Sequence, residues 1–81
     1  MARRILIVSA VQQEADAIGL PDCTYVVVGG IGRTNAAVAT TTAIHDEGPF
    51  DFVISAGVAG SLPDSGLSIG DIVVASSCLY V

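Results

Sequence analysis

The chain has 81 residues, of which 52% are hydrophobic and only 14% are charged. Its net charge is −5 and its three basic residues are Arg3, Arg4 and Arg33, so the sequence excludes the basic surface that nucleic-acid binding requires. No apolar run approaches the roughly 18 residues of a membrane-spanning helix, and the charged residues are too few to coat a free-standing particle of this size.

Four short apolar runs are rich in β-branched residues and predict strands. They occupy residues 4–8, 24–28, 51–56 and 72–76. Because these runs are apolar at consecutive positions, they are typical of a sheet that helices cover on both faces. Helical segments alternate with the first three strands, and this order predicts an α/β fold.

Two segments between the strands predict helices, residues 12–18 weakly and residues 34–47 more strongly. Thr34 and Asn35 are the candidate caps of the second helix, and a Gly-Pro pair ends it. Small side chains let a helix approach a sheet closely, and they predict the face that packs on the sheet. That face comprises Ala36, Ala37, Val38, Ala39, Ala43 and Ile44.

Residues 57–70 lie between two predicted strands but show no helical periodicity, and they contain Pro63 and Gly66. We therefore expect an ordered loop here, with Asp71 ordering the turn that enters the last strand. Because a connection without a helix allows adjacent strands to run in opposite directions, the sheet is predicted to be mixed.

Three loops rich in small residues follow the first three predicted strands. They are residues 9–14, 29–33 and 55–61. A strand that ends in Gly, Ala and Ser leaves room for a ligand to approach its backbone. Ligands of open α/β sheets bind outside the carboxyl ends of the strands, so the three loops predict one pocket.

Glu14 is the most suggestive ionisable residue, because it lies just beyond a strand end and in the first turn of a predicted helix. There it could orient or deprotonate a water molecule, the role of a carboxylate in breaking a glycosidic bond. An acid in the first turn also complements the helix dipole. A capping role or a plain surface charge is therefore the alternative.

The run Gly29-Gly30-Ile31-Gly32-Arg33 partly matches a dinucleotide-binding fingerprint, and a non-catalytic dinucleotide-binding module is the alternative from a different functional class. The third glycine is missing, since Asn35 stands at its position, and Asp51 begins a strand where the ribose-binding acid should end one. A tight turn whose backbone lines the pocket is the simpler interpretation.

The two cysteines, Cys23 and Cys78, belong to no CxxC or metal-ligand spacing. Such a pair is typical of reduced thiols in an intracellular protein. We accordingly expect a cytoplasmic protein without a metal site.

Four motifs in this order resemble the purine nucleoside phosphorylase/nucleosidase superfamily. They are Ser-Ala-Val-Gln-Gln-Glu at residues 9–14, Gly-Ile-Gly-Arg at 30–33, Ser-Ala-Gly-Val-Ala-Gly-Ser at 55–61 and Ser-Ile-Gly-Asp-Ile-Val-Val at 68–74. Within the superfamily, residues 10–17 and 53–60 are most similar to the futalosine hydrolases of menaquinone biosynthesis. The 5′-methylthioadenosine/S-adenosylhomocysteine nucleosidases are close behind.

The resemblance implies a three-layer α/β/α fold with a mixed sheet, of which the chain would be an incomplete, N-terminal part. It implies hydrolysis of a purine nucleoside without a cofactor, by a homo-oligomer when the protein is full-length. Glu14 would hold the attacking water, Ala10 would contact the substrate, and Ile31 would line the side that takes the 5′ substituent. The floor under ribose and base would comprise Val58, Ala59 and Gly60.

Two departures from the superfamily affect the expected chemistry. Its phosphorylases place arginines in the first loop and just before the floor, but residues 9–14 and 54–55 contain no Arg. Arg33 alone is a poor substitute for a phosphate clamp, so water is the expected nucleophile. The leaving-group Asp and the ribose-binding Met-Glu pair of the family come from its C-terminal half, so we expect these 81 residues alone to be inactive.

Overall fold

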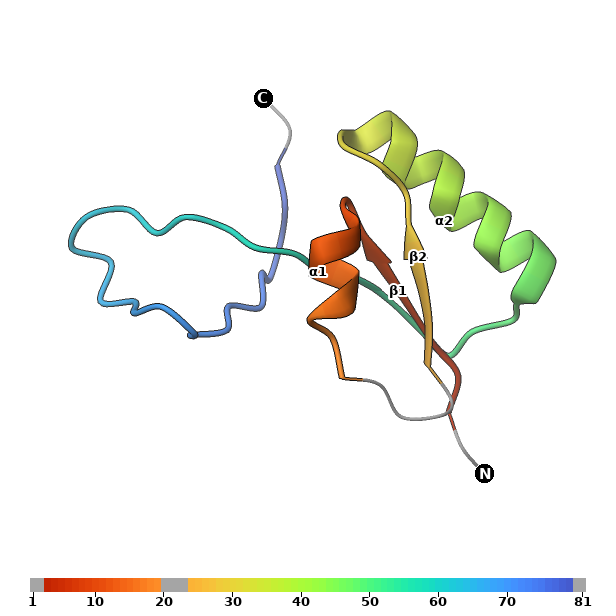
Figure 1. The fold of residues 1–81 in the computed structure, drawn as a ribbon, viewed down its shortest axis with the longest axis horizontal. Helices are drawn as coiled ribbons and strands as arrows, with labels where there is room; N and C mark the ends of the chain where they lie inside the picture. Colours follow the sequence, from red (N-terminus) through yellow and green to blue (C-terminus); the bar gives the residue numbers. More distant parts are fainter. Residues whose placement is uncertain (1–2, 20–23, 80–81) are drawn as a thin grey trace.

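A computed structural model of the chain describes residues 3–19 and 24–79. In chain order its elements are β1 (Ile5–Ser9), α1 (Gln12–Asp16), β2 (Thr24–Val28), α2 (Arg33–Glu47) and β3 (Phe52–Ser55). The strands form one parallel sheet in the order β2-β1-β3, and Figure 1 shows α1 and α2 on opposite sides of it. The predicted α/β class is confirmed, and the described part has three layers.

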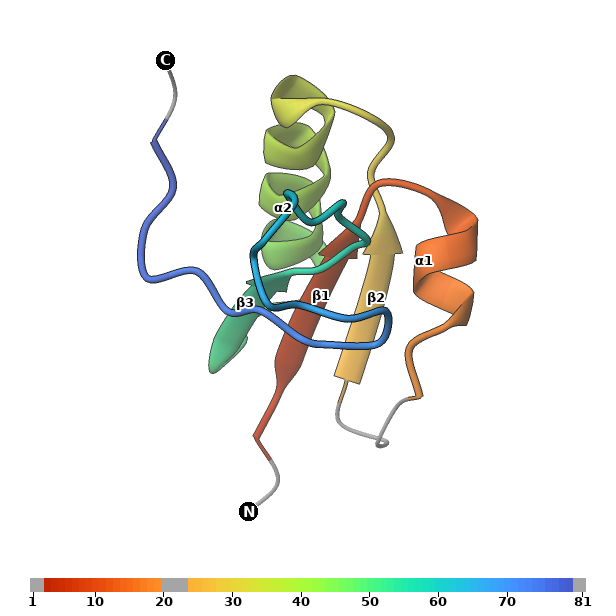
Figure 2. The ribbon, with the colours of Figure 1, turned by 90° about the vertical axis from the view of Figure 1, so that its left-hand side faces the viewer.

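The strand order determines where a ligand can bind. The chain leaves the central strand β1 for β2 on one side, then returns past β1 to β3 on the other side (Figure 2). Right-handed crossovers of this kind place the two connecting helices on opposite faces. The direction of winding reverses between β1 and β3, and in parallel sheets the crevice at such a reversal is the usual ligand site.

The hydrophobic core lies between β1 and α2. Leu6 is fully buried, while Val8 and Ala43 are 5% and 8% exposed. Val27 and Phe50 pack against this cluster. Side chains two residues apart point to the same face of a strand, so Leu6 and Val8 both face α2 and hold the helix on the sheet.

The start of α2 differs slightly from the prediction. The helix begins at Arg33, with Gly32 as its N-cap residue and no side-chain cap. Asn35 instead donates a hydrogen bond from its Nδ2 to the carbonyl oxygen of Ile31, at 2.8 Å. Thr34 and Asn35 are therefore not caps, because the helix already includes them.

The face of α2 that contacts the sheet is also different in part. The buried or half-buried positions are Ala36, Ala39, Thr40 and Ala43. These four share one helix face because they are spaced by three and four residues. Val38 and Ile44, which the prediction placed against the sheet, are 62% and 44% exposed. The prediction relied on their apolar character, but the angular position around the helix decides which residues face the sheet.

The strand predicted at residues 72–76 is wrong. Ile72 and Val74 are 88% and 89% exposed, and Figure 1 shows the chain after β3 as a long excursion away from the sheet. A strand needs a neighbour that pairs with its N–H and C=O groups, and no described strand lies beside this segment. The mixed character of the sheet stays a prediction, since the three described strands are all parallel.

The predicted cover on both faces of the sheet is incomplete at β3. Phe52 and Val53 are each 48% exposed and Ile54 is 44% exposed. The reason is that β3 is an edge strand, paired only with β1 in the described sheet. Its apolar side chains are typical of a strand that is covered on both faces, and the described residues cover them only in part.

The segment at residues 57–70 contains no helix or strand, as expected, but it has ordered turns. The amide of Ser68 donates to Oδ2 of Asp71 at 2.8 Å, and the Asp71 amide donates back to the Ser68 carbonyl at 3.0 Å. Asp71 orders a turn, as predicted, but the strand that this turn was expected to enter is not formed.

Two smaller expectations concern membranes and thiols. Among the described helices, none combines the length and apolarity needed to cross a membrane. Cys78 is a free and exposed thiol, while Cys23 lies outside the described residues.

Candidate functional site

The loops that follow the three strands meet at one edge of the sheet, because parallel strands end at the same edge. Backbone bonds continue beyond the strands: the Gly29 amide donates to the Ser9 carbonyl at 2.9 Å, and the Gly30 amide to the Ala10 carbonyl at 3.1 Å. On the other side of β1, the Ala56 amide donates to the Val8 carbonyl at 3.0 Å. These bonds hold the first residues of the three loops side by side.

The loop between β2 and α2 turns sharply through two glycines. Gly30 and Gly32 have φ angles of 95° and 94°, in the left-handed region that only glycine enters without strain. The turn presents backbone rather than side chains to the space above the sheet. The prediction of a tight strand-to-helix turn is confirmed.

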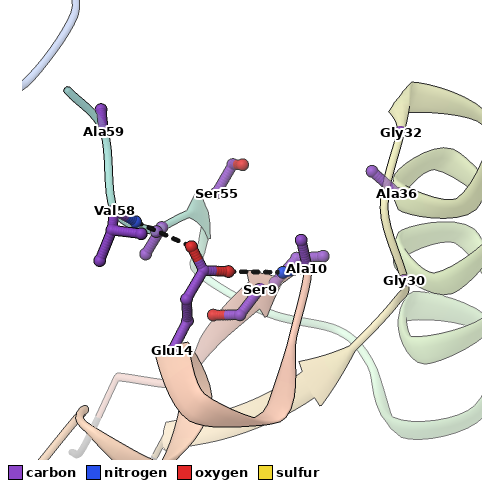
Figure 3. Close-up of a pocket in the computed structure, with 12 residues that line it drawn as sticks. Ser9, Ala10, Glu14, Gly30, Gly32, Ala36, Ser55, Val58 and Ala59 are labelled. Atoms are coloured by element: carbon purple, nitrogen blue, oxygen red, sulfur yellow. Dashed lines mark hydrogen bonds between the residues drawn. The ribbon is translucent and has the colours of Figure 1, made fainter.

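An open hollow of about 360 Å³ lies between these loops. The end of β1 and the loop after it contribute Ser9 and Ala10, the loop after β2 contributes Gly30 and Gly32, and the end of β3 with its loop contributes residues 55–59. In the described part of the chain, Glu14 is the only ionisable residue that lines it. Figure 3 shows the Glu14 carboxylate between the loops of β1 and β3, at the reversal point of the sheet.

Three backbone amides hold the Glu14 carboxylate. Oε1 accepts a hydrogen bond from Ala10 at 3.1 Å and Oε2 accepts one from Val58 at 2.8 Å (Figure 3). Oε1 also accepts a hydrogen bond from Val11 at 3.3 Å. Val11 is the N-cap residue of α1, and its hydrocarbon side chain can accept no bond. Glu14 therefore does serve the start of its helix, as the capping alternative expects, and the same carboxylate also reaches the loop after β3.

These amides set the protonation of the group. The hydrogen bond from the Val58 amide is the largest influence and lowers the pKa of Glu14, partial burial opposes it, and the bonds from Ala10 and Val11 lower the pKa further. Because the group is ionised and weakly basic, it is better suited to accept a hydrogen bond from a water molecule than to remove its proton.

We expect the Glu14 carboxyl group to titrate below its ordinary value of 4.5. A lowered pKa means that its ionised form stabilises the fold above the unfolded-state pKa, and that this contribution is lost as the pH falls through the lower, folded-state value. Carbon-detected NMR titration of the Glu14 side chain measures the shift. A midpoint at or above 4.5 would contradict the bonding described here.

The structure brings together four of the six predicted site residues. Ala10, Glu14, Val58 and Ala59 line the hollow, whereas Gly60 and Ile31 are not among its described lining residues. The Ile31 side chain is 77% exposed. The roles that the resemblance assigned to these six residues stay predictions.

Ser9, Ser55 and Gly57 also line the hollow, within the loops predicted at residues 9–14 and 55–61, although none of the three was singled out as a site residue. Val8 and Ala36 line it from outside the three predicted loops. Ser9 is 2% exposed, and its Oγ has no hydrogen-bond partner among the described residues. A polar residue that directly ends an apolar strand was a usable signal for both serines. The importance of Gly57 depends on Glu14, which lies far away in the chain, and no local pattern indicates it.

The geometry also bears on the dinucleotide alternative. Oδ2 of Asp51 accepts a hydrogen bond from the Arg4 amide at 2.7 Å, just before β1 begins. Asp51 therefore lies at the opposite edge of the sheet from Gly30 and Gly32, where it cannot contact a ribose bound at the glycine turn.

The described residues also contain no cluster of His, Cys, Asp and Glu that could hold a metal ion.

The chain is similar to one family of proteins. The sequence profile of the phosphorylase superfamily matches residues 22–80. Proteins named 5′-methylthioadenosine/S-adenosylhomocysteine nucleosidase are similar to the chain in several bacteria. The one from Staphylococcus epidermidis is 49% identical over 51 residues, which are 63% of this chain and 22% of that protein.

Two further proteins of that name show the same relationship. The one from Shewanella loihica is 53% identical over 47 residues, 58% of this chain and 20% of that protein. The one from Buchnera aphidicola is 39% identical over 56 residues, 69% of this chain and 23% of that protein. The chain thus spans about a fifth of the length of the curated relatives it matches. No solved structure matches the chain significantly.

Proposed function

The chain belongs to the phosphorylase superfamily, and from that premise we propose that it carries the water-directing part of an enzyme that hydrolyses the N-glycosidic bond of a purine nucleoside. One observation carries the proposal: a single carboxylate, Glu14, is held by three backbone amides where the winding of the sheet reverses. The names of the similar proteins support the same reaction class.

In the proposed reaction a water oxygen attacks C1′ of the ribose while the bond from C1′ to the purine nitrogen breaks. The electron pair of that bond leaves with the base, and an acid elsewhere in the protein protonates the base. Once its oxygen is bonded to C1′, the added water is strongly acidic and would give one proton to the Glu14 carboxylate, which leaves the free sugar. A carboxylate oxygen has two lone pairs, so Oε2 can accept one bond from the Val58 amide and one from the water. Glu14 would direct the water to C1′ as positive charge develops on the ribosyl group.

Water suits this hollow better than phosphate. Arg and Lys donors give the strongest hydrogen bonds to phosphate, and the described lining residues include neither. Arg33 lies at the start of α2, outside the described lining. The small side chains and backbone amides after β3 leave space for a sugar and a flat base above Val58 and Ala59.

The substrate has two candidates, each with its own support. The motifs at residues 10–17 and 53–60 resemble those of futalosine hydrolases, which release hypoxanthine and leave dehypoxanthine futalosine. The similar curated proteins are named for 5′-methylthioadenosine and S-adenosylhomocysteine. We propose futalosine from the motifs, and the two thioethers are the alternative that the relatives support.

A side-by-side assay separates these candidates. The full-length protein is incubated with futalosine, 5′-methylthioadenosine and S-adenosylhomocysteine at equal concentrations, and base release is followed by reverse-phase chromatography. We expect hypoxanthine from futalosine at the highest kcat/KM. Rapid adenine release with futalosine untouched would assign the protein to the thioether nucleosidases, and no release from any of the three would overturn the proposed function.

A further inference from the structure

Gly57 lies unusually close to the Glu14 carboxylate. A Cβ atom placed on Gly57 would be 2.5 Å from Oε2, 3.1 Å from Cδ and 3.4 Å from Oε1 of Glu14. Cβ atoms in real structures essentially never come within 3.0 Å of such a neighbouring atom. All three nearest atoms thus belong to the Glu14 side chain. The carboxylate can occupy its present position only because residue 57 has no Cβ atom.

The backbone conformation gives no other reason for this glycine. Gly30 and Gly32 have positive φ angles, but the φ of Gly57 lies outside the left-handed region. An L-residue could therefore adopt the same backbone without strain. What the position excludes is a side chain, because the Glu14 carboxylate occupies the space.

The close approach lets Glu14 join two loops that are distant in sequence. The amide of Val58, the next residue, donates to Oε2 at 2.8 Å, across 44 positions of the chain. On its other side the carboxylate is bound by the amides of Ala10 and Val11. Both oxygens are thereby fixed, and Oε2 lies at the lining of the hollow between the loops of β1 and β3 (Figure 3).

We propose that Gly57 is a positioning residue: its missing side chain admits the Glu14 carboxylate to the Val58 amide, and this contact aims the carboxylate at the reacting water. The inference rests on the proposed function for the identity of the reaction. The carboxylate is the end of a flexible side chain, so a methyl group at Gly57 would displace Glu14 and leave the sheet intact. A displacement of about 1 Å in a reacting group can lower a rate by about 10²-fold.

The test substitutes Gly57→Ala in the full-length protein, with Gly19→Ala as the matched control. Gly19 has no heavy atom within 4 Å of its Cβ position and no positive φ. In the unsubstituted protein and the control, the NMR signal of the Val58 amide should follow the titration of Glu14. In Gly57→Ala it should no longer do so, and kcat should fall by about 10²-fold with little change in KM. An unchanged Val58 titration or an unchanged kcat would overturn the proposal.

A double substitution separates positioning from blocking of the substrate. If Gly57 acts through Glu14, Gly57→Ala should lower kcat no further in a Glu14→Gln background. Additive losses, or a rise in KM alone, would indicate that the new methyl group obstructs the substrate, and the proposal would be wrong. The amide titration needs no substrate, so it decides the contact even if the protein hydrolyses no purine nucleoside.

Discussion

Glu14→Gln in the full-length protein is expected to lower kcat by about 10²- to 10⁴-fold and to leave KM nearly unchanged. The substitution removes the negative charge that, in the proposed reaction, would direct the water and stabilise the positive ribosyl group. At present one carboxylate oxygen accepts a hydrogen bond from Ala10 and the other accepts one from Val58. The substitution replaces one of these two oxygens with an NH₂ group, which cannot accept a bond from a backbone amide. Glutamine has one acceptor oxygen, so it can satisfy the amides on one side only, and its NH₂ group would face the amides on the other side. The side chain would therefore not keep the position that the carboxylate has beside the water.

Asp16→Asn is the matched control for this substitution. Asp16 lies on the same short helix, is exposed, and accepts a hydrogen bond from Gln12 Nε2 at 2.7 Å, outside the described lining of the hollow. Its loss should leave kcat and KM unchanged. An unaltered kcat in Glu14→Gln would return Glu14 to a capping role alone.

The 81 residues by themselves are expected to show no measurable release of base from any purine nucleoside. Departure of the base needs an acid on the side of the glycosidic bond opposite the water. The hollow offers only Glu14 among the described residues that line it, and that group is held ionised by amide donors. Asp51, at the other edge of the sheet, and Asp71, in the turn with Ser68, cannot supply the acid.

The same chain should expose enough apolar surface to aggregate or to bind a hydrophobic dye. On β3, Phe52, Val53 and Ile54 are nearly half exposed. Further along the chain, Ile69, Ile72 and Val74 are almost fully exposed. The edge of β3 that has no partner strand among the described residues adds a template for pairing between chains. Size-exclusion chromatography and dye fluorescence measure these properties. A soluble monomer that melts cooperatively and turns over a purine nucleoside would contradict both expectations.

The first half of the fold was predictable because its local patterns agree with its tertiary contacts. The apolar run of β1 is also the centre of the sheet, so Leu6 and Val8 are buried as their sequence context indicates. Residues 72–76 have the same kind of pattern and yet form no strand, because pairing depends on a neighbour that the pattern does not contain. Val38 was misplaced for a related reason, since an apolar residue is buried only if the helix turns it toward the sheet.

The candidate site was predictable to the extent that strand ends indicate it. The position of Glu14 after β1 and the small residues after β3 pointed to one edge of the sheet, where the structure places both. The bond from Val58 to Glu14 could not be foreseen, because it joins loops 44 residues apart and depends on the order of the strands. Gly57 became informative only when the Glu14 carboxylate was located beside it.

Hydrolysis directed by Glu14 is tested most directly by base release in phosphate-free buffer. The full-length protein and its Glu14→Gln variant are incubated with the best purine nucleoside, with and without added phosphate, and the sugar product is identified by mass spectrometry. We predict free sugar at a rate that phosphate does not change, and a rate about 10²- to 10⁴-fold lower in the variant. Release that requires phosphate and yields a sugar 1-phosphate, or equal rates in both proteins, would contradict the account.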